Sequence, residues 1–415
     1  MVRHLPAPSG SYSVGYTDVV NKYGAGGLLM RLFYPIDNTD KVDNKFMEDY
    51  NYVKGLGNFL GMPSFIVNFF VSDLRIWAHK NAPPSLPLEK CAVTVFSHGL
   101  GGNRLLYSTK CLELASHGMV VAAVEHSDES ASATHYLAAE EPHEKVWVDY
   151  LKGVDKLKDP EDPAEENPKD PQKPNKSAKA PKAFRNKQVL HRARSCTEAL
   201  NILETINCGS FEPVSSGVDL LLLKGRLDVE RCAIAGHSFG GATVMATLAD
   251  DHRFKVGVGL DVWTFPLNDD IYQKLQRNVP ILFVNTGSFQ WPENLAGVRK
   301  MDADTCPGSV DRPMVTTVGT VHQSQSDTPF FTTNAFLAKK IRLRGDEEPL
   351  RATQLDNSLM MGFIGKHLGL PFAKEIEDLV KSMTGRLYYG SAVELDEERI
   401  KEAKERLCNP KPSSL

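Results

Sequence analysis

Six short apolar runs alternate with segments of helical spacing, and this alternation constrains the fold of the chain more than any other feature. The runs are CAVTVFSHG (91–99), GMVVAAVEH (118–126), CAIAGHS (232–238), KVGVGLD (255–261), VPILFVN (279–285) and PMVTTVG (313–319). Segments such as LYSTKCLELASHG and GGATVMATLAD lie between them and repeat apolar residues at helical spacing. Buried strands that alternate with helices form a mostly parallel central sheet flanked by helices. We therefore predict an α/β fold.

The run at 232–238 leads directly into Gly236-His237-Ser238-Phe239-Gly240, which has the form GxSxG. Glycine-serine turns are common in loops, so the motif alone is a weak signal. Here it follows an apolar strand and opens a helix, the context in which small neighbours let a strained turn expose a serine above the sheet of an α/β-hydrolase. The sequence thus predicts an α/β-hydrolase fold with Ser238 as the nucleophile.

A serine nucleophile needs a histidine base, which comes after the acid in the chain order of this fold class. His322 follows the last predicted strand, in a loop beyond the strand end, where catalytic groups of such sheets gather. His252 lies within a turn or two of the motif and is more typical of the surface, and His367 is typical of a helix surface. We predict that His322 is the base.

Asp261 ends the apolar run 255–261, so its carboxylate is expected at the same sheet edge as Ser238. This position favours Asp261 as the acid that orients the base. Four other carboxylates remain as alternatives: Asp302, Asp304, Asp327 and Glu293.

The negative charge that develops on an attacked carbonyl needs backbone N–H donors. The fold takes one from the residue after the nucleophile, here Phe239, and another from a loop after an earlier strand. SHGLGGNR (97–104) is the candidate loop, because its glycines allow a close approach to substrate, and Leu100 or a neighbour is the expected donor. The sequence contains no HExxH, no EF-hand loop and no CxxC pair, so we expect neither a metal nor another cofactor.

Composition bears on the cellular setting of the chain. Its 415 residues carry a formal net charge of −4, which lacks the basic excess of nucleic-acid-binding proteins. Seven scattered cysteines without a CxxC pair favour free thiols in a reducing compartment. The first residues contain neither an apolar stretch of signal-peptide length nor a glycine at position 2 for myristoylation. We expect a cytoplasmic protein that makes at most a peripheral contact with membranes.

A charged segment, residues 155–187, interrupts the alternating pattern. It is rich in proline, lysine and acidic residues and nearly lacks apolar ones, so it cannot bury enough surface to offset chain entropy. We predict one α/β-hydrolase domain over residues 1–415 with a mobile insertion at 155–187, and we consider a partner-binding role for the insertion less favoured.

Five longer stretches of the chain are FSHGLGGNRLLYS, LASHGMVVAAVEHSDESASATHY, GHSFGGATV, GLDVWTFPL and VGTVHQSQSDTPF. They resemble the platelet-activating-factor acetylhydrolases of the plasma and intracellular type II kind, the group VII phospholipases A(2). The similarity runs from RLFYP (31–35) to FIGKHLGL (363–370). It implies a calcium-independent serine esterase that removes short or oxidatively truncated sn-2 acyl groups, typically acetyl, from phospholipids.

The resemblance also implies site residues at the matching positions. The triad and the two backbone oxyanion donors fall on Ser238, Asp261, His322, Leu100 and Phe239. Three further positions match residues that line the family's site and are our pocket candidates: His98, Trp263 and Gln323.

The chain departs from the family pattern within two of these stretches. HGLGAFR is HGLGGNR here, which removes an aromatic side chain beside the oxyanion loop. EHRDRSASAT is EHSDESASAT, which replaces two arginines by Ser127 and Glu129. The first change bears on the shape of the acyl pocket and the second on headgroup preference.

Two apolar segments bear on lipid contact. GLGNFLGMPSFIVNFF (55–70) is too short and interrupted to span a bilayer. Its pattern alone favours a core helix, whereas the resemblance favours a face that meets lipid, together with a second helix at 329–343. The basic residues near this second helix face either anionic headgroups or solvent: Lys339, Lys340, Arg342 and Arg344.

The leading hypothesis is therefore an esterase that acts on short sn-2 acyl groups of phospholipids. One alternative is a general carboxylesterase or lipase with the same triad and a different acyl pocket. The other is a non-catalytic lipid-binding module, which the intact set of serine, histidine and aspartate disfavours.

Overall fold

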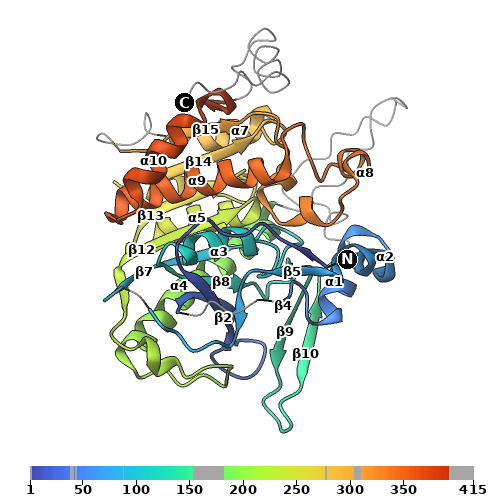
Figure 1. The fold of residues 1–415 in the computed structure, drawn as a ribbon, viewed down its shortest axis with the longest axis vertical. Coiled ribbons are helices and arrows are strands. Elements are labelled where there is room, and N and C mark those ends of the chain that lie inside the picture. The colour runs from blue at the N-terminus through green and yellow to red at the C-terminus, as the bar shows by residue number, and fades with distance from the viewer. Residues whose placement is uncertain are drawn as a thin grey trace.

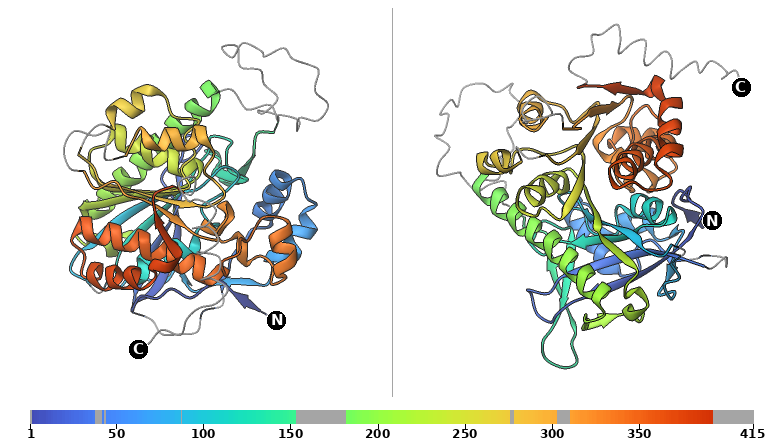
Figure 2. Two further views of the ribbon diagram at one scale, coloured as in Figure 1. Left: turned by 90° about the horizontal axis from the view of Figure 1, so that it is seen from above. Right: turned by 90° about the vertical axis from the view of Figure 1, so that its left-hand side faces the viewer.

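One large sheet organises the computed structural model, which describes residues 2–37, 42, 44–86, 88–152, 182–275, 278–302 and 310–391. Eleven strands in these ranges form the sheet, and helices cover both of its faces (Figures 1 and 2). Across the sheet the strands are β11 (Ser215–Ser216), β2 (Ser13–Val20), β3 (Leu29–Ile36), β8 (Val120–Glu125), β7 (Cys91–Ser97), β12 (Leu227–His237), β13 (Phe254–Leu260), β14 (Ile281–Thr286), β15 (Met314–Thr317) and β16 (Leu387–Tyr389), with β6 (His79–Lys80) beside β2.

The middle of the sheet is parallel, as the sequence predicts. From β8 to β15 every neighbouring pair of strands runs in the same direction. The flanking strands β2, β3 and β16 pair antiparallel. The six parallel strands coincide with the six apolar runs of the sequence, so the α/β prediction with a mostly parallel sheet is confirmed.

The central strands are apolar over most of their length because both faces of the sheet are covered. In β12, Ala233 and Ala235 join the core on one face, whereas Cys232 and Ile234 join the core on the other. The first face packs against α3 (Ser108–Ser116), α9 (Pro349–Leu368) and α10 (Ala373–Ser382). The second packs against α4 (Lys182–Cys208), α5 (Phe239–Asp250), α6 (Asp269–Lys274) and α7 (Pro292–Arg299).

Three helices lie together at one end of the molecule, on the right in Figure 1: α1 (Tyr50–Leu60), α2 (Ser64–Val71) and α8 (Ala335–Lys340). A small sheet of β1 (Arg3–His4), β5 (Leu74–Ile76) and β4 (Asn44–Lys45) packs nearby, and β9 (Ala133–Leu137) and β10 (Lys145–Asp149) form a hairpin. In the described part of the chain, no helix combines the length and the apolarity that crossing a bilayer requires.

The predicted insertion at 155–187 differs from the structure at its end. Residues 155–181 lie outside the described ranges, but 182–187 form the start of α4. Arg185 and Asn186 are buried there, with Asn186 donating to the carbonyl of Pro266 at 2.8 Å. The predicted boundary is therefore too late, because composition cannot separate a charged loop from a helix that begins with buried polar residues.

The apolar segment 55–70 forms two helices, because α1 ends at Gly61 with φ 67° and Pro63 precedes α2. Their inner residues, such as Leu56 and Val67, belong to the core, whereas Phe65 and Phe69 are 69% and 77% exposed. The segment 55–70 therefore contributes residues both to the core and to the surface.

The single helix expected at 329–343 is wrong in extent, since a 3₁₀-helix (Thr328–Phe330) overlaps its start and α8 covers only Ala335–Lys340. The side chain of Asn334 accepts from the N–H of Leu337 and starts α8, and the positive φ of Arg342 follows its end.

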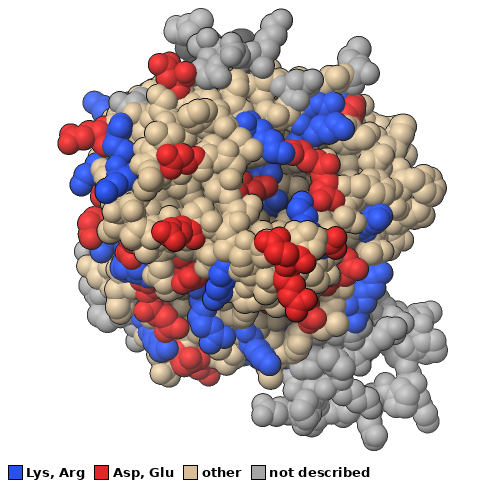
Figure 3. Space-filling view, turned by 90° about the horizontal axis from the view of Figure 1, so that it is seen from below, with Lys and Arg blue, Asp and Glu red and all other residues tan. Residues whose placement is uncertain are grey.

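On the face seen in Figure 3, basic and acidic side chains are mixed over the surface.

Candidate active site

Ser238 lies in the turn between β12 and α5 with φ 59° and ψ −115°, a strained conformation for a residue that has a side chain. Its N–H donates to the carbonyl of Leu260 at 2.8 Å, and its own carbonyl accepts from the N–H of Trp263 at 3.1 Å. The backbone around β13 therefore holds the strained turn in place. The strand, turn and helix predicted from GxSxG are all present.

The two glycines of the motif are required by close backbone contacts. A Cβ at Gly236 would lie 2.4 Å from the carbonyl oxygen of Gly240. A Cβ at Gly240 would lie 2.1 Å from the carbonyl oxygen of Ser97, at the end of β7. Glycine at both positions lets α5 begin against the neighbouring strand, and Ser238 lines a cavity at that point.

Asp261 and His322 form a hydrogen-bonded pair, with Nδ1 of His322 2.9 Å from Oδ2 of Asp261. Thr286 holds the carboxylate from the other side, since its N–H donates to Oδ1 and its hydroxyl to Oδ2, each at 2.6 Å. The ring of His322 stacks on Phe289 with centroids 3.8 Å apart. With its Nδ1–H donated to the carboxylate, His322 presents Nε2 as an acceptor, and it lines the same cavity as Ser238.

The other carboxylates weighed from the sequence have different surroundings. Asp327 is buried at the start of α3, where it accepts from the N–H groups of Ser108 (2.6 Å) and Thr109 (3.3 Å). Burial raises the pKa of Asp327 to about 6, against the hydrogen bonds from Thr109. Glu293 is exposed and Asp302 is partly buried, whereas Asp304 lies outside the described residues.

The other histidines weighed as bases also differ from His322. His252 is exposed, as predicted. His367 lies on α9 and its Nε2 is 2.9 Å from a carboxylate oxygen of Asp311. Neither lines the cavity that contains Ser238.

The loop after β7 turns the peptide of Leu100 in a defined direction. The carbonyl of Gly99 accepts from Nδ1–H of His98 at 2.8 Å and from the N–H of Gly102 at 3.0 Å. Because C=O and N–H of a trans peptide point in opposite directions, the N–H of Leu100 faces away from His98. Leu100 lines the cavity beside Ser238, where an oxyanion donor would lie.

His98 keeps one tautomer because both ring nitrogens are engaged. Its Nε2 accepts from the N–H of His126 at 3.2 Å, so Nδ1 carries the proton that it donates to Gly99. Burial and the nearby Arg192 charge hold the pKa of His98 well below its usual value. A neutral His98 in a fixed tautomer therefore holds the turn at Gly99, within the candidate oxyanion loop.

His237 and Tyr107 were missed in the sequence. The hydroxyl of Tyr107 accepts from the N–H of Gly99 at 3.1 Å and lies 2.8 Å from Nδ1 of His237, whose ring centroid is 4.4 Å from that of His322. Burial, then the charges of His322 and Lys110, hold the pKa of His237 well below its usual value. A neutral His237 does not repel a proton that arrives on His322. The variable second position of GxSxG carries no signal for this role.

Ligand atoms of His237, Asp261 and His322 all lie within 4.8 Å of one another, a spacing that a metal ion could also use. The oxygens of Asp261 already accept from Thr286 and His322. This bonding explains the proximity of the three side chains as a hydrogen-bonded group.

A cavity of about 570 Å³ opens above these residues. One wall comes from α1 and α2, and the opposite wall from α8 and the residues that follow it. The wall side chains are predominantly apolar: Leu56, Phe59, Leu60, Met62, Ile66, Val67, Phe70, Leu337, Ile341 and Leu343. Gly101 packs directly under the first wall, because a Cβ there would lie 2.1 Å from the ring of Phe59.

Of the three pocket candidates, only Gln323 lines this cavity. His98 is buried behind the oxyanion loop. Trp263 packs edge-on against Phe239 at 5.4 Å and stacks on Phe265 at 5.7 Å. His98 and Trp263 therefore pack against residues of the candidate site without lining this cavity, and their role in substrate binding stays a prediction.

Most residues that depart from the family pattern lie off the cavity wall, although Gly102, beside Asn103, lines it. Asn103 is buried and its amide donates to the hydroxyl of Ser132 at 3.2 Å, while its carbonyl oxygen accepts from the N–H of Leu105 at 3.0 Å. Neither Asn103 nor the pair Ser127 and Glu129 lines the cavity. Asn103 therefore joins the loop 97–104 to the segment between β8 and β9.

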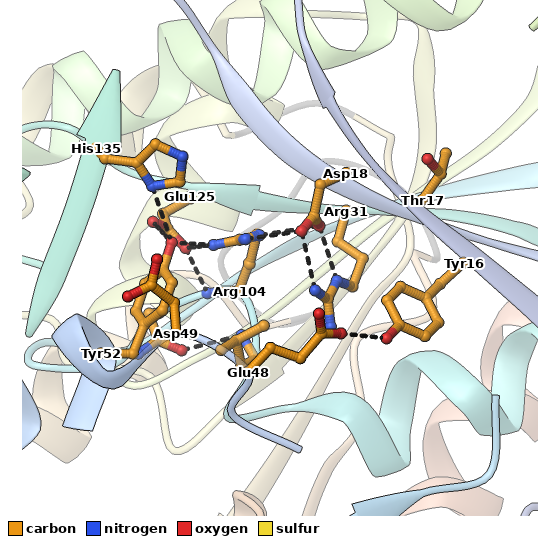
Figure 4. Close-up of polar contacts among 12 residues, drawn as sticks. Tyr16, Thr17, Asp18, Arg31, Glu48, Asp49, Tyr52, Arg104, Glu125 and His135 are labelled. Atoms are coloured by element: carbon orange, nitrogen blue, oxygen red, sulfur yellow. Dashed lines mark hydrogen bonds and ion pairs between the residues drawn. The ribbon is translucent and has the colours of Figure 1, made fainter. Parts of the chain in front are cut away.

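A buried ion network fastens α1 to the sheet next to this loop (Figure 4). Arg104, only 4% exposed, donates to both oxygens of Asp18 (3.1 and 2.9 Å), to Glu125 (2.5 Å) and to the hydroxyl of Tyr52 on α1. Arg31 donates to the same Asp18 carboxylate at 2.8 and 2.9 Å. Burial raises the pKa of Asp18, but Arg104 and Arg31 together hold it well below its usual value.

Comparisons with known proteins agree with this site. A family model described as platelet-activating factor acetylhydrolase, isoform II, matches residues 2–385. The platelet-activating factor acetylhydrolase of Canis lupus familiaris is 38% identical over 376 residues, covering 88% of this chain and 78% of the relative. That of Gallus gallus is 35% identical over 383 residues, covering 88% and 84%.

Two more distant matches bear on the fold of the chain. A putative phospholipase A2 of Schizosaccharomyces pombe is 25% identical over 387 residues, covering 81% of this chain and 82% of the relative. A ferulic acid esterase structure from Streptomyces cinnamoneus matches with a TM-score of 0.64 and 18% identity, covering 94% of this chain and 99% of the esterase. This similarity confirms the α/β-hydrolase fold, and the family match over most of its length means that the chain belongs to the platelet-activating factor acetylhydrolase, isoform II, family.

Proposed function

We propose that the chain hydrolyses short or oxidised sn-2 acyl groups of phospholipids without calcium, including the acetyl group of platelet-activating factor. The products are a lysophospholipid and the free acid. The observation that carries the proposal is the Asp261–His322 pair, which shares one apolar cavity with Ser238.

The proposed reaction proceeds through an acyl-enzyme. Ser238 Oγ attacks the ester carbonyl while Nε2 of His322 takes its proton, and Asp261 stabilises the imidazolium that results. The N–H groups of Leu100 and Phe239 bind the oxyanion. His322 then returns the proton to the leaving alcohol, and water activated by the same histidine releases the acid.

The cavity supports a lipid substrate over a polar ester. Its α1 and α2 wall is apolar, whereas Ser238, His322 and Gln323 contribute polar groups. Further polar lining comes from Ser326, Thr328, Thr332 and Arg342. The apolar walls suit the hydrocarbon parts of a lipid, and the polar groups suit its ester.

The test is hydrolysis of phosphatidylcholine analogues whose sn-2 chain grows from acetyl to long acyl, with a calcium chelator present. We expect kcat/KM to fall steeply as the chain lengthens. Flat or rising activity would indicate a general carboxylesterase or lipase, and binding of vesicles without hydrolysis of any ester would indicate a lipid-binding module.

We further propose that the cavity mouth meets lipid surfaces. Phe65 and Phe69 on α2 and Phe336 on α8 are 69%, 77% and 78% exposed, and both helices contribute cavity walls. Apolar side chains that surround a cavity mouth insert into the headgroup region of a bilayer.

Not every basic residue near α8 serves this contact. Arg344 donates to the carbonyls of Pro329 and Thr332, and Lys339 pairs with Asp346 at 3.1 Å. Headgroup contact is therefore assigned to Lys340 and Arg342, which are exposed.

Replacing Phe65, Phe69 and Phe336 by serine should lower binding to phosphatidylcholine vesicles by about tenfold or more, because each ring loses burial in lipid. Hydrolysis of a water-soluble acetyl ester should stay unchanged. Sedimentation of vesicles measures the first effect and a colorimetric assay the second. Leu221→Ser is the control, since Leu221 is 57% exposed on the 3₁₀-helix Leu220–Leu223 and does not line the cavity. Equal vesicle binding by both variants would contradict the assignment of this face.

A further inference from the structure

A fully buried arginine lies behind the proposed oxyanion loop. Arg192 on α4 is 0% exposed, and its NH1 donates to the carbonyl of His98 at 2.7 Å. That carbonyl begins the turn whose following peptide presents the N–H of Leu100. The contact therefore anchors one end of the loop that supplies the first oxyanion donor.

The same guanidinium also contacts the residue that supplies the second donor. Its Cζ lies 4.4 Å from the ring centroid of Phe239, within the range of a cation–π interaction. Phe239 is fully buried and is the first residue of α5, directly after Ser238. One side chain thus touches both segments that carry the proposed donors.

Arg192 is itself held by two neighbours on the segment after β8. Its Nε donates to Oδ2 of Asp128 (3.2 Å) and to the hydroxyl of Ser130 (3.0 Å), and its NH2 donates to the same hydroxyl (2.8 Å). The carbonyl of Ser130 accepts from the N–H of Gly101 at 2.8 Å. The oxyanion loop, the segment 128–130 and α4 therefore form one connected unit around the guanidinium.

A buried charge is costly, and packing alone would be served as well by an apolar side chain of similar size. Arginine offers what such a residue cannot: a planar group with five donors in fixed directions. In this site those donors reach a backbone carbonyl on one side and a carboxylate and hydroxyl on the other.

We propose that Arg192 is a positioning residue that fixes the separation of the two oxyanion donors, through the carbonyl of His98 and the ring of Phe239. The proposal rests on the proposed function, because it needs Leu100 and Phe239 to bind the oxyanion. Donors that are displaced by a fraction of an ångström lose most of their effect on the transition state, whereas binding of the ground-state ester changes little.

The test compares Arg192→Lys with Arg312→Lys. Lysine keeps the charge but cannot reach all partners at once. Arg312 is a matched control, since it is buried and donates to three carbonyls elsewhere: Val279 (3.1 Å), Met301 (2.9 Å) and Leu275 (2.7 Å). Both variants are assayed with a soluble acetyl ester below their melting temperatures.

For Arg192→Lys we expect kcat to fall roughly 10²-fold with KM within about twofold of the parent value. Affinity for a trifluoromethyl ketone, which forms a tetrahedral adduct with an oxyanion, should fall by the same factor. Arg312→Lys should change neither quantity by more than about twofold. Ser130→Ala, which removes one anchor of the guanidinium, should show the same pattern at about a tenth of the effect and serves where Arg192→Lys fails to fold.

Equal losses of kcat in the two lysine variants, in proportion to the unfolded fraction, would overturn the proposal. So would a loss of kcat in Arg192→Lys with unchanged affinity for the ketone. Failure of the proposed function itself is distinguishable. In that case the parent protein would hydrolyse esters no faster than Ser238→Ala does.

Discussion

Replacing Ser238 by alanine is expected to lower kcat for ester hydrolysis by roughly 10⁶-fold, which is the loss found when a serine nucleophile is removed from a triad. Ser238 lies in a strained turn and lines the same cavity as His322, which is paired with Asp261. What remains would be the small acceleration that oxyanion donors supply to water attack.

Hydrolysis of a short-chain phosphatidylcholine, followed by release of the free acid, measures this effect. Thermal unfolding should change little, since the backbone bonds from Leu260 and Trp263 that hold the strained turn do not involve the hydroxyl. Ser195→Ala is the control: Ser195 is half-buried on α4, does not line the cavity, and its hydroxyl donates to the carbonyl of His191. Hydrolysis retained by the Ser238 variant would place the nucleophile elsewhere.

Replacing Arg104 by methionine is expected to lower the free energy of unfolding by about 3 to 5 kcal/mol, the cost of leaving a buried charge without its partner. Glu125 is fully buried opposite Arg104, and the hydroxyl of Tyr52 loses the same donor. The Asp18 carboxylate would keep only Arg31.

This loss should depend on pH in one direction. Because the folded pKa of Asp18 lies below its unfolded value, its pairing adds stability above about pH 4 that disappears as the pH falls further. The difference between parent and variant should therefore be largest near neutral pH and shrink below about pH 4.

Urea unfolding across this pH range is the measurement, with Arg253→Met as the control. Arg253 makes comparable contacts to Asp251 and Glu204, but its side chain is 36% exposed, so its loss should cost at most about 1 kcal/mol. Equal losses in the two variants would mean that the network of Figure 4 adds no more than surface ion pairs do.

Much of the fold could be predicted from the sequence because its signals are local and repeated. Strands buried on both faces are apolar throughout, so the run at 255–261 indicates β13 without knowledge of its neighbours. The candidate site residues Ser238, Asp261 and His322 were predicted from their places after such strands. Since parallel strands end at one edge of the sheet, order along the chain sufficed to bring them together.

What could not be predicted depends on contacts between distant segments. His98 matches a residue that lines the site in the family. In this structure its ring is buried instead, because both ring nitrogens bind backbone groups. Arg192 lies nearly a hundred residues beyond the loop that it holds, and no spacing rule connects the two. The end of the insertion was placed too late for a similar reason, as the burial of Arg185 and Asn186 depends on the packed structure.

The two walls of the cavity differ in how they are anchored, and this bears on altering which lipids the enzyme accepts. The α1 wall is tied through Tyr52 to a charge network, so widening the cavity on that side would disturb the scaffold. The α8 wall is a six-residue helix with Phe336 largely in solvent. Engineering for bulkier acyl groups should therefore begin with Leu337 and Ile341, where selectivity can change at little expense to folding.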